Sequence, residues 1–128
     1  MRIAALVARI LLGLIFLVFG LNMFFNFIPM GPMPTGPAGS FLGVLAATHY
    51  TLAVGAVMVT SGALLLIGRF VPLALVLLGP VLVNILIFHL LMARSAIGLG
   101  LFAALLWFVV FARHRAAFAA IFQPRFRD

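Results

Sequence analysis

The chain of 128 residues is 67% hydrophobic and 7% charged, and its mean hydropathy is +1.41. A soluble domain of this length has too little interior to bury so much apolar surface, so these values exclude an ordinary water-soluble globular protein. The net charge is +7, but the arginines stand at the ends of apolar runs, where helix anchoring and anionic lipid explain them better than nucleic acid does. Because the chain has no cysteine, disulfides and thiolate metal sites are excluded.

The first apolar run covers residues 3–28 and is long enough to cross a bilayer as a helix. Pro29 to Ser40 follows it and holds four prolines, three glycines and no charge. Proline removes backbone donors and glycine adds conformational freedom, so this segment predicts a non-helical loop on the outer face.

Three further apolar runs predict three more spanning helices, at residues 41–67, 70–92 and 96–113. Gly68 and Pro72 are typical of a tight helix–helix connection, with glycine past one helix end and proline in the next first turn. The basic tail, residues 114–128, mixes arginines with Phe118, Ile121 and Phe122 and predicts a short helix lying on the membrane surface. The whole chain, residues 1–128, is therefore expected to form one all-α domain, a transmembrane four-helix bundle.

Arginine placement predicts the orientation of this bundle. With four spans, only Arg94 falls on one side, and all the other arginines fall on the opposite side. Because short cytoplasmic flanks carry the excess of basic residues, we expect both termini to be cytoplasmic. The arginines at the cytoplasmic ends are candidates for anchoring lipid or binding an anionic group: Arg9, Arg69, Arg113 and Arg115.

Polar side chains within the spans are the candidates for ligand binding, because lipid offers them no partner. A rise of about 1.5 Å per residue places Asn22, His49 and His89 at a common depth of roughly 25–29 Å from the cytoplasmic helix ends. Asn84 joins the set, although on an ideal helix it points about 140° away from His89. Three interpretations stay open: bonds to neighbouring helices, loop backbone or water; a shared pocket for a quinone or lipid-like head; and bis-histidine binding of haem or another tetrapyrrole.

Small residues predict close helix contacts. Gly13 and Gly20 lie on the first predicted helix. The second carries two opposed stripes: one holds Gly55, Met58 and Gly62, and the other holds His49, Ala53, Ala56, Thr60 and Ala63. These small-residue faces exceed what one neighbour each can use, which predicts that at least one contacts another polypeptide, either a second copy or an unlike subunit. No carboxylate lies at membrane depth and no nucleophile–base pair stands out, so we expect no metal site and no catalytic set.

Two stretches resemble the DoxX family of small bacterial membrane proteins: RILLGLIFLVFGLN (Arg9 to Asn22) and LLLIGRFVPLALVLLGPVLVNILIFHL (Leu64 to Leu90). The resemblance implies a four-helix bundle in the bacterial cytoplasmic membrane, with Arg9, Asn22, Asn84 and His89 as the matching polar residues. Some members are associated with quinone-linked thiosulfate oxidation or with partners in oxidative-stress defence.

The function expected from these observations is that of an accessory or structural subunit of a larger membrane complex, without chemistry of its own. The alternative is a membrane subunit of a quinone-linked oxidoreductase, and a further alternative is a small carrier of lipid or metabolite. The expected partners are membrane lipid and a protein in the membrane.

Overall fold

The computed structural model describes residues 2–125, and within that range the chain is helical with no strand. A 3₁₀ segment, η1, precedes the last long helix, and another, η2, follows it. The elements are α1 (Arg2–Phe25), α2 (Gly36–Ala47), α3 (Tyr50–Ile67), α4 (Val71–Met92), η1 (Arg94–Ala96), α5 (Gly98–His114) and η2 (Arg115–Phe122).

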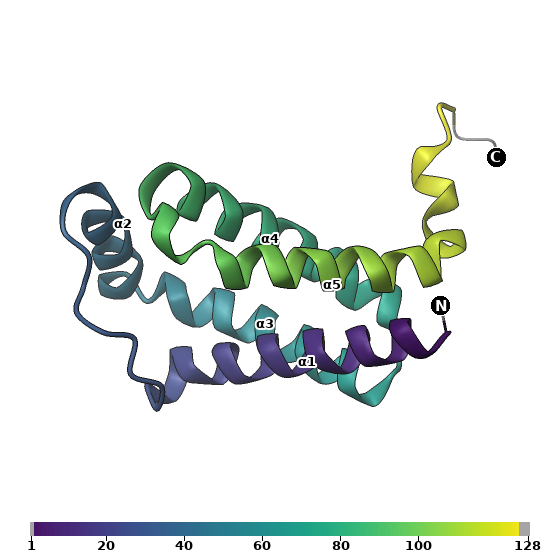
Figure 1. Cartoon of the computed structure of the whole chain (residues 1–128), viewed down its shortest axis with the longest axis horizontal. Coiled ribbons are helices and arrows are strands. Elements are labelled where there is room, and N and C mark those ends of the chain that lie inside the picture. The colour runs from purple at the N-terminus through teal and green to yellow at the C-terminus, as the bar shows by residue number, and fades with distance from the viewer. Residues whose placement is uncertain (1, 126–128) are drawn as a thin grey trace.

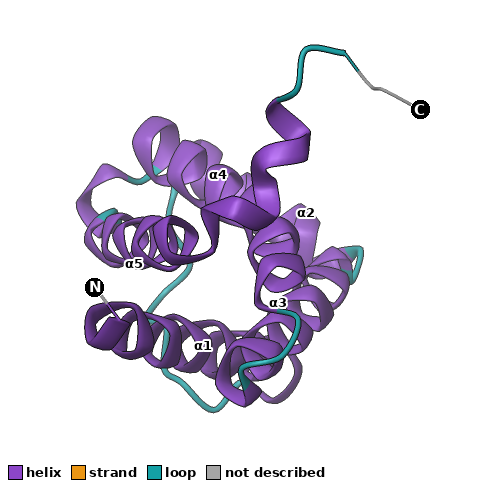
Figure 2. Cartoon of the chain, turned by 90° about the vertical axis from the view of Figure 1, so that its right-hand side faces the viewer, coloured by secondary structure: helices purple, strands orange, loops and turns teal. Residues whose placement is uncertain are grey.

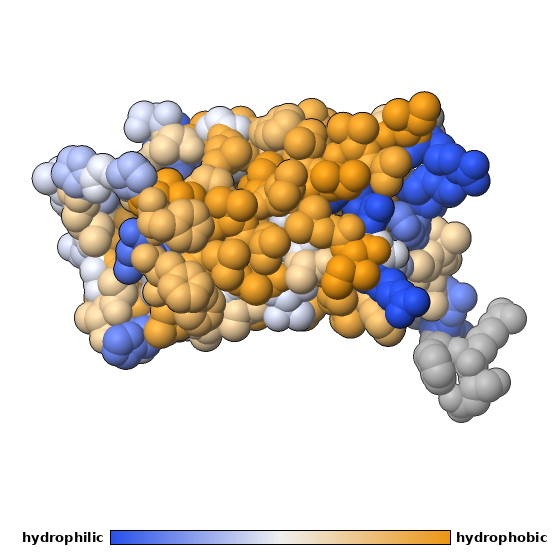
Figure 3. Space-filling view, turned by 90° about the horizontal axis from the view of Figure 1, so that it is seen from below, coloured by the Kyte–Doolittle hydropathy of each residue, from blue (hydrophilic) through white to orange (hydrophobic). Residues whose placement is uncertain are grey.

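Four helices are long and apolar enough to cross a membrane: α1, α3, α4, and α5 with its continuation to Phe122. They run side by side (Figure 1), and viewed along the bundle they form a ring in the order α1, α3, α4, α5 (Figure 2). On the face that Figure 3 shows, apolar side chains form a broad band over the middle of the bundle, and hydrophilic ones gather toward its two ends. The predicted all-helical class with four candidate spans is therefore confirmed.

The closest contact in the bundle joins α1 to α3 through glycines. A Cβ atom on Gly62 would lie 2.6 Å from the backbone nitrogen of Leu17 and 2.8 Å from the carbonyl oxygen of Gly13. A Cβ atom on Gly55 would lie 3.2 Å from the carbonyl oxygen of Gly20. Two backbones can approach this closely only where side chains are missing.

This contact removes the four glycines from the predicted partner surface but leaves the opposite stripe of α3 untested. All four of them face the neighbouring helix of the same chain and are buried there: Gly13, Gly20, Gly55 and Gly62. They pack α1 on α3, whereas the opposite stripe of α3, with Ala53, Ala56 and Thr60, is exposed.

The rest of the core is apolar and continuous with the glycine contact. Leu12 and Phe16 of α1 pack in one cluster with Leu65 of α3, Leu78 of α4 and Val110 of α5, and each is at most 2% exposed. The indole Nε1 of Trp107 also donates a hydrogen bond of 3.0 Å to the carbonyl oxygen of Leu75, which joins α5 to α4. Trp107 therefore fastens neighbouring helices as well as contributing apolar surface.

The second predicted span differs from the structure at its outer end. Residues 41–67 are not one helix, because α2 ends at Ala47 and α3 begins at Tyr50. His49 between them has φ 60°, in the left-handed region that histidine tolerates better than most residues. The Thr48 hydroxyl donates to the Val44 carbonyl oxygen at 2.7 Å, which offers the backbone an alternative to continuing the helix.

The outer loop predicted for residues 29–40 is also shorter than expected. Helix α2 begins inside it, at Gly36, and lies at the outer end of the bundle (Figure 1). Pro37 occupies the first turn of α2, where its missing N–H removes no helical hydrogen bond. Composition therefore predicted a loop where proline in fact starts a helix.

The two ends of the described chain lie at the same end of the bundle (Figure 1). There η2 turns away from the direction of α5. Its Phe118 is buried against Phe111, with ring centroids 5.0 Å apart, while Ile121 and Phe122 are exposed. The tail is thus helical over Arg115–Phe122, as predicted, and its position on the membrane surface stays a prediction; residues 126–128 lie outside the described range.

The glycine contact predicts a difference between two alanine substitutions. Gly62→Ala should destabilise the bundle by about 1–3 kcal/mol, because the methyl group would meet backbone atoms that cannot move independently. Gly43→Ala in α2 meets nothing within 4 Å and should stabilise by up to about 1 kcal/mol through helix propensity. Reversible unfolding in mixed detergent micelles measures both, and equal unfolding midpoints would contradict the packing described here.

Candidate functional site

The predicted outer cluster of polar residues is divided among separate local roles. Asn22 is buried near the C-terminus of α1, and its Oδ1 accepts a hydrogen bond of 2.8 Å from the backbone N–H of Ile28. Asn26, two positions before Ile28, adopts φ 49° and ends the helix. The amide of Asn22 therefore holds the start of the outer loop against the helix end.

His89 bonds to its own helix. Its Nδ1 lies 2.8 Å from the carbonyl oxygen of Ile85, and because a carbonyl can only accept, Nδ1 carries the proton. The ring also lies edge-on to Phe88, at 5.2 Å between centroids. His49 is exposed at the junction of α2 and α3, outside the helical span in which it was expected.

Asn84 is exposed on α4, and its Nδ2 donates a hydrogen bond of 2.8 Å to the carbonyl oxygen of Pro80. The recorded hydrogen bonds of Asn22, Asn84 and His89 thus all end on nearby backbone of the same chain. None joins one member of the predicted set to another, so these contacts give the quinone and tetrapyrrole interpretations no support.

Arg9 has a structural task at the opposite end of the bundle. Its Nη1 donates to the carbonyl oxygen of Leu65 at 2.6 Å, in the last turn of α3. The last carbonyls of a helix lack internal partners and carry partial negative charge, so a guanidinium there satisfies both needs. Gly68 adopts φ 80° at the end of α3, and a Cβ atom on it would collide with the Arg9 guanidinium.

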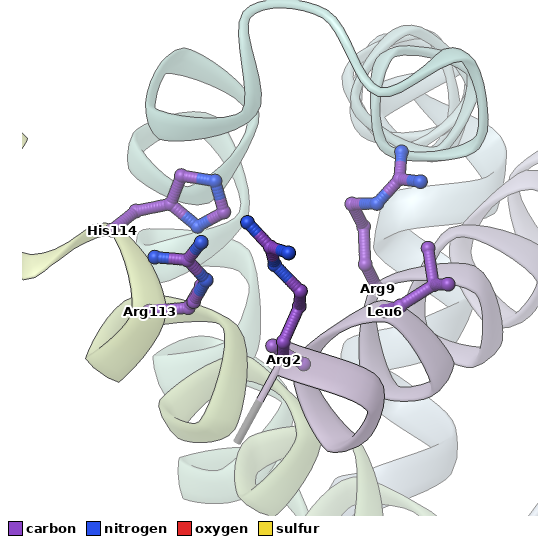
Figure 4. A pocket seen from close by; sticks show the side chains of 6 residues that line it. Arg2, Leu6, Arg9, Arg113 and His114 are labelled. Carbon is purple, nitrogen blue, oxygen red and sulfur yellow. The ribbon is translucent and has the colours of Figure 1, made fainter.

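A basic pocket lies between the start of α1 and the end of α5. Its volume is about 410 Å³, and Figure 4 shows basic side chains from both helices gathered around it. The pocket is lined by Arg2, Ala5, Leu6, Arg9, Arg113 and His114. We call this the arginine pocket.

The arginine pocket includes only part of the predicted anionic-group set. It brings Arg9 and Arg113 together, while Arg69 and Arg115 do not line it. Sequence reasoning missed Arg2 and His114 as site residues. The predicted topology could have indicated them, because it places both termini on one side of the membrane and so brings the start of the first helix near the end of the last.

The chemistry available in the arginine pocket is recognition of negative charge. Guanidinium groups bind carboxylates and phosphates in a bidentate manner and stay protonated at physiological pH. His114 uses Nδ1 to bond the Val110 carbonyl oxygen at 3.0 Å, which orients its ring. Within residues 2–125, no group of three or more side chains suited to metal binding is present.

Comparison with known proteins finds no matching family model, no matching curated protein and no matching solved structure.

The buried amide of Asn22 gives a testable stability difference. Asn22→Ala leaves the Ile28 N–H without its partner at the end of α1 and should cost about 1–2 kcal/mol of unfolding free energy. Thr60→Ala removes only an exposed hydroxyl that bonds its own helix, to the Ala56 carbonyl oxygen, and should change stability by less than about 0.5 kcal/mol. Detergent unfolding of both variants checks the prediction, which fails if Asn22→Ala is as stable as Thr60→Ala.

Proposed function

We propose that this protein is a DoxX-like accessory or structural subunit of a larger complex in the bacterial cytoplasmic membrane. The observation that carries the proposal is the outward position of Asn84 near the middle of α4. The resemblance of Arg9 to Asn22 and of Leu64 to Leu90 to DoxX proteins supports it as well, because some members of that family are associated with protein partners.

Asn84 would leave polar atoms facing lipid if the bundle stood alone. One Nδ2–H is used by the Pro80 carbonyl oxygen. Within residues 2–125, the Oδ1 atom of Asn84 accepts no hydrogen bond. Lipid provides no donor or acceptor, so polar side chains at this depth normally face protein or water. A partner helix against α4 would supply the missing bonds.

Pro80 adds a second polar feature to the same face of α4. Proline has no N–H, so the carbonyl oxygen of Val76, four residues earlier, loses its helical donor. Val76, Pro80 and Asn84 are all exposed, and their spacing of four residues places them along one stripe. The unbonded carbonyl oxygen of Val76 and the remaining hydrogen-bonding atoms of the Asn84 amide together suit a polar side chain of another protein. We propose that this side chain belongs to an unlike subunit.

The remaining polar side chains support a structural role. Asn22, Arg9 and Trp107 bond backbone atoms elsewhere in the chain and hold its elements together. The Ser61 hydroxyl is fully buried without a hydrogen-bond partner in the described chain, and no base lies bonded to it. Asn22, Arg9 and Trp107 are thus engaged in the fold, and Ser61 stands alone.

Asn84→Leu tests the proposed contact. The substitution should release the unlike subunit from the protein purified in mild detergent, while the bundle stays folded because Asn84 bonds only its own helix. A lost interhelical hydrogen bond in a membrane is worth about 0.6–2 kcal/mol, so the partner's occupancy should fall about threefold to thirtyfold. Native mass of the tagged chain, extracted from its own membranes, provides the measurement.

Thr60→Val is the matched control, since Thr60 is an exposed polar residue on α3 whose hydroxyl already donates to its own helix. It should leave the partner bound. A wild-type chain that runs as a lone 13.8 kDa monomer in several gentle detergents would refute the subunit role, and one that binds only a second copy of itself would refute the unlike partner.

The proposed orientation places both termini in the cytoplasm and α2 on the outer face. The support is the arginine asymmetry, with Arg94 alone at the outer end. Single cysteines at Thr35 and Gln123, both exposed, can be probed with an impermeant thiol reagent on intact cells. Position 35 should react and position 123 should react only after the cells are opened; the reverse pattern would invert the topology.

A further inference from the structure

We propose that the arginine pocket binds the phosphate head group of an anionic phospholipid in the leaflet next to the chain termini. This inference is independent of the proposed subunit role, because the pocket lies at the end of the bundle and the Asn84 stripe lies at mid-span. It rests on the charge of the pocket, on its shape and on its level relative to the membrane.

The charge of the pocket calls for an anion. Arg2 and Arg9 come from α1 and Arg113 from α5, so two helices bring three guanidinium groups to one space (Figure 4). No carboxylate side chain exists among residues 2–125, because Asp128 is the only acidic residue of the sequence. Holding like charges together is unfavourable unless an anion lies between them. A phosphate accepts bidentate hydrogen bonds from several guanidinium groups at once.

The start of α1 adds to this preference. Its first N–H groups have no internal helical partner and carry partial positive charge, and no acidic residue lies in the first turn to compensate. Arg9 spends one donor on the Leu65 carbonyl oxygen, which fixes the side chain and leaves further donors for the pocket. Arg9 is therefore a preorganised cation, whereas Arg2 and Arg113 close around the ligand from the two helices.

The shape of the pocket suits an amphiphile better than a free ion. About 410 Å³ falls in the range of small-molecule sites and exceeds what one phosphate needs. Ala5 and Leu6 add apolar lining from α1, and Leu6 is 47% exposed. The head group would lie among the arginines while the glycerol and the first acyl carbons pass over Ala5 and Leu6.

The level of the pocket matches the head-group layer. It adjoins the point where α5 ends at His114 and η2 turns away from the bundle axis (Figure 1). A segment that runs across the axis and exposes Ile121 and Phe122 marks the membrane interface. Anionic lipids in this layer attract each nearby arginine by about 1 kcal/mol, and a pocket that gathers three arginines concentrates that attraction at one place.

Native mass spectrometry of the full chain in a neutral detergent tests the site. The probes are phosphatidylglycerol and phosphatidylcholine with identical acyl chains, and inorganic phosphate. The wild-type chain should retain phosphatidylglycerol in preference to phosphatidylcholine. Arg2→Gln and Arg113→Gln should each lower phosphatidylglycerol affinity about fivefold, and the double variant should lower it about 25-fold.

Arg69→Gln is the matched control, because it removes the same charge at the same end of the bundle but from outside the pocket. It should change lipid affinity less than twofold. Arg9 is left intact, since its bond to Leu65 also holds the bundle together. Unfolding midpoints of Arg2→Gln and Arg113→Gln within a few degrees of the wild type would show that lost lipid binding is not lost folding.

Three results would overturn the proposal. One is an equal loss of phosphatidylglycerol affinity in Arg69→Gln and Arg2→Gln, which would mean that general surface charge, and not the pocket, binds the lipid. Another is equal retention of phosphatidylcholine and phosphatidylglycerol. The third is displacement of the lipid by inorganic phosphate at equal concentration, which would assign the pocket to a free anion instead of a lipid head group.

Discussion

Gly62 and Gly13 bring the backbones of α3 and α1 into direct contact, and the rest of the bundle is arranged around that pair. Apolar side chains gain little by leaving lipid for a protein core, so close van der Waals packing has to supply the association energy. Side chains around the glycine contact then interdigitate, as Leu12 and Phe16 do with Leu65. Helices α4 and α5 complete the ring on the surface that this pair provides.

The few polar interactions fix the alignment of the helices, which apolar packing alone does not determine. Arg9 joins the start of α1 to the last turn of α3, and Asn22 holds the opposite end of α1 against the outer loop. Trp107 links α5 to α4 through a carbonyl oxygen. Each bond ends on backbone, so its strength depends on correct helix register rather than on the identity of a partner side chain. These bonds specify the alignment of helices that packing alone would hold loosely.

The two proposed binding surfaces arise from different features of the same architecture. The arginine pocket exists because the start of α1 and the end of α5 lie at the same end of the bundle, where Arg2 and Arg113 have no acidic neighbour within residues 2–125. The stripe on α4 exists because Pro80 and Asn84 face outward, away from the ring. The first surface suits an anionic group and the second suits a hydrogen-bonding side chain, so the proposed lipid and the proposed protein partner would not compete for the same site.

Composition and hydropathy determined the four candidate spans, because lipid requires long apolar helices whatever their neighbours are. The turn at Gly68 was predictable for a similar reason, since a left-handed backbone favours glycine wherever it occurs. Only the tertiary structure decided that Gly13, Gly20, Gly55 and Gly62 lie in the contact between α1 and α3, that His49 lies between two helices, and that Arg2 and Arg113 line one pocket. Hydropathy is a property of each segment alone, whereas these contacts depend on the rotation and register of helices, which apolar sequences with little amphipathic character leave unspecified.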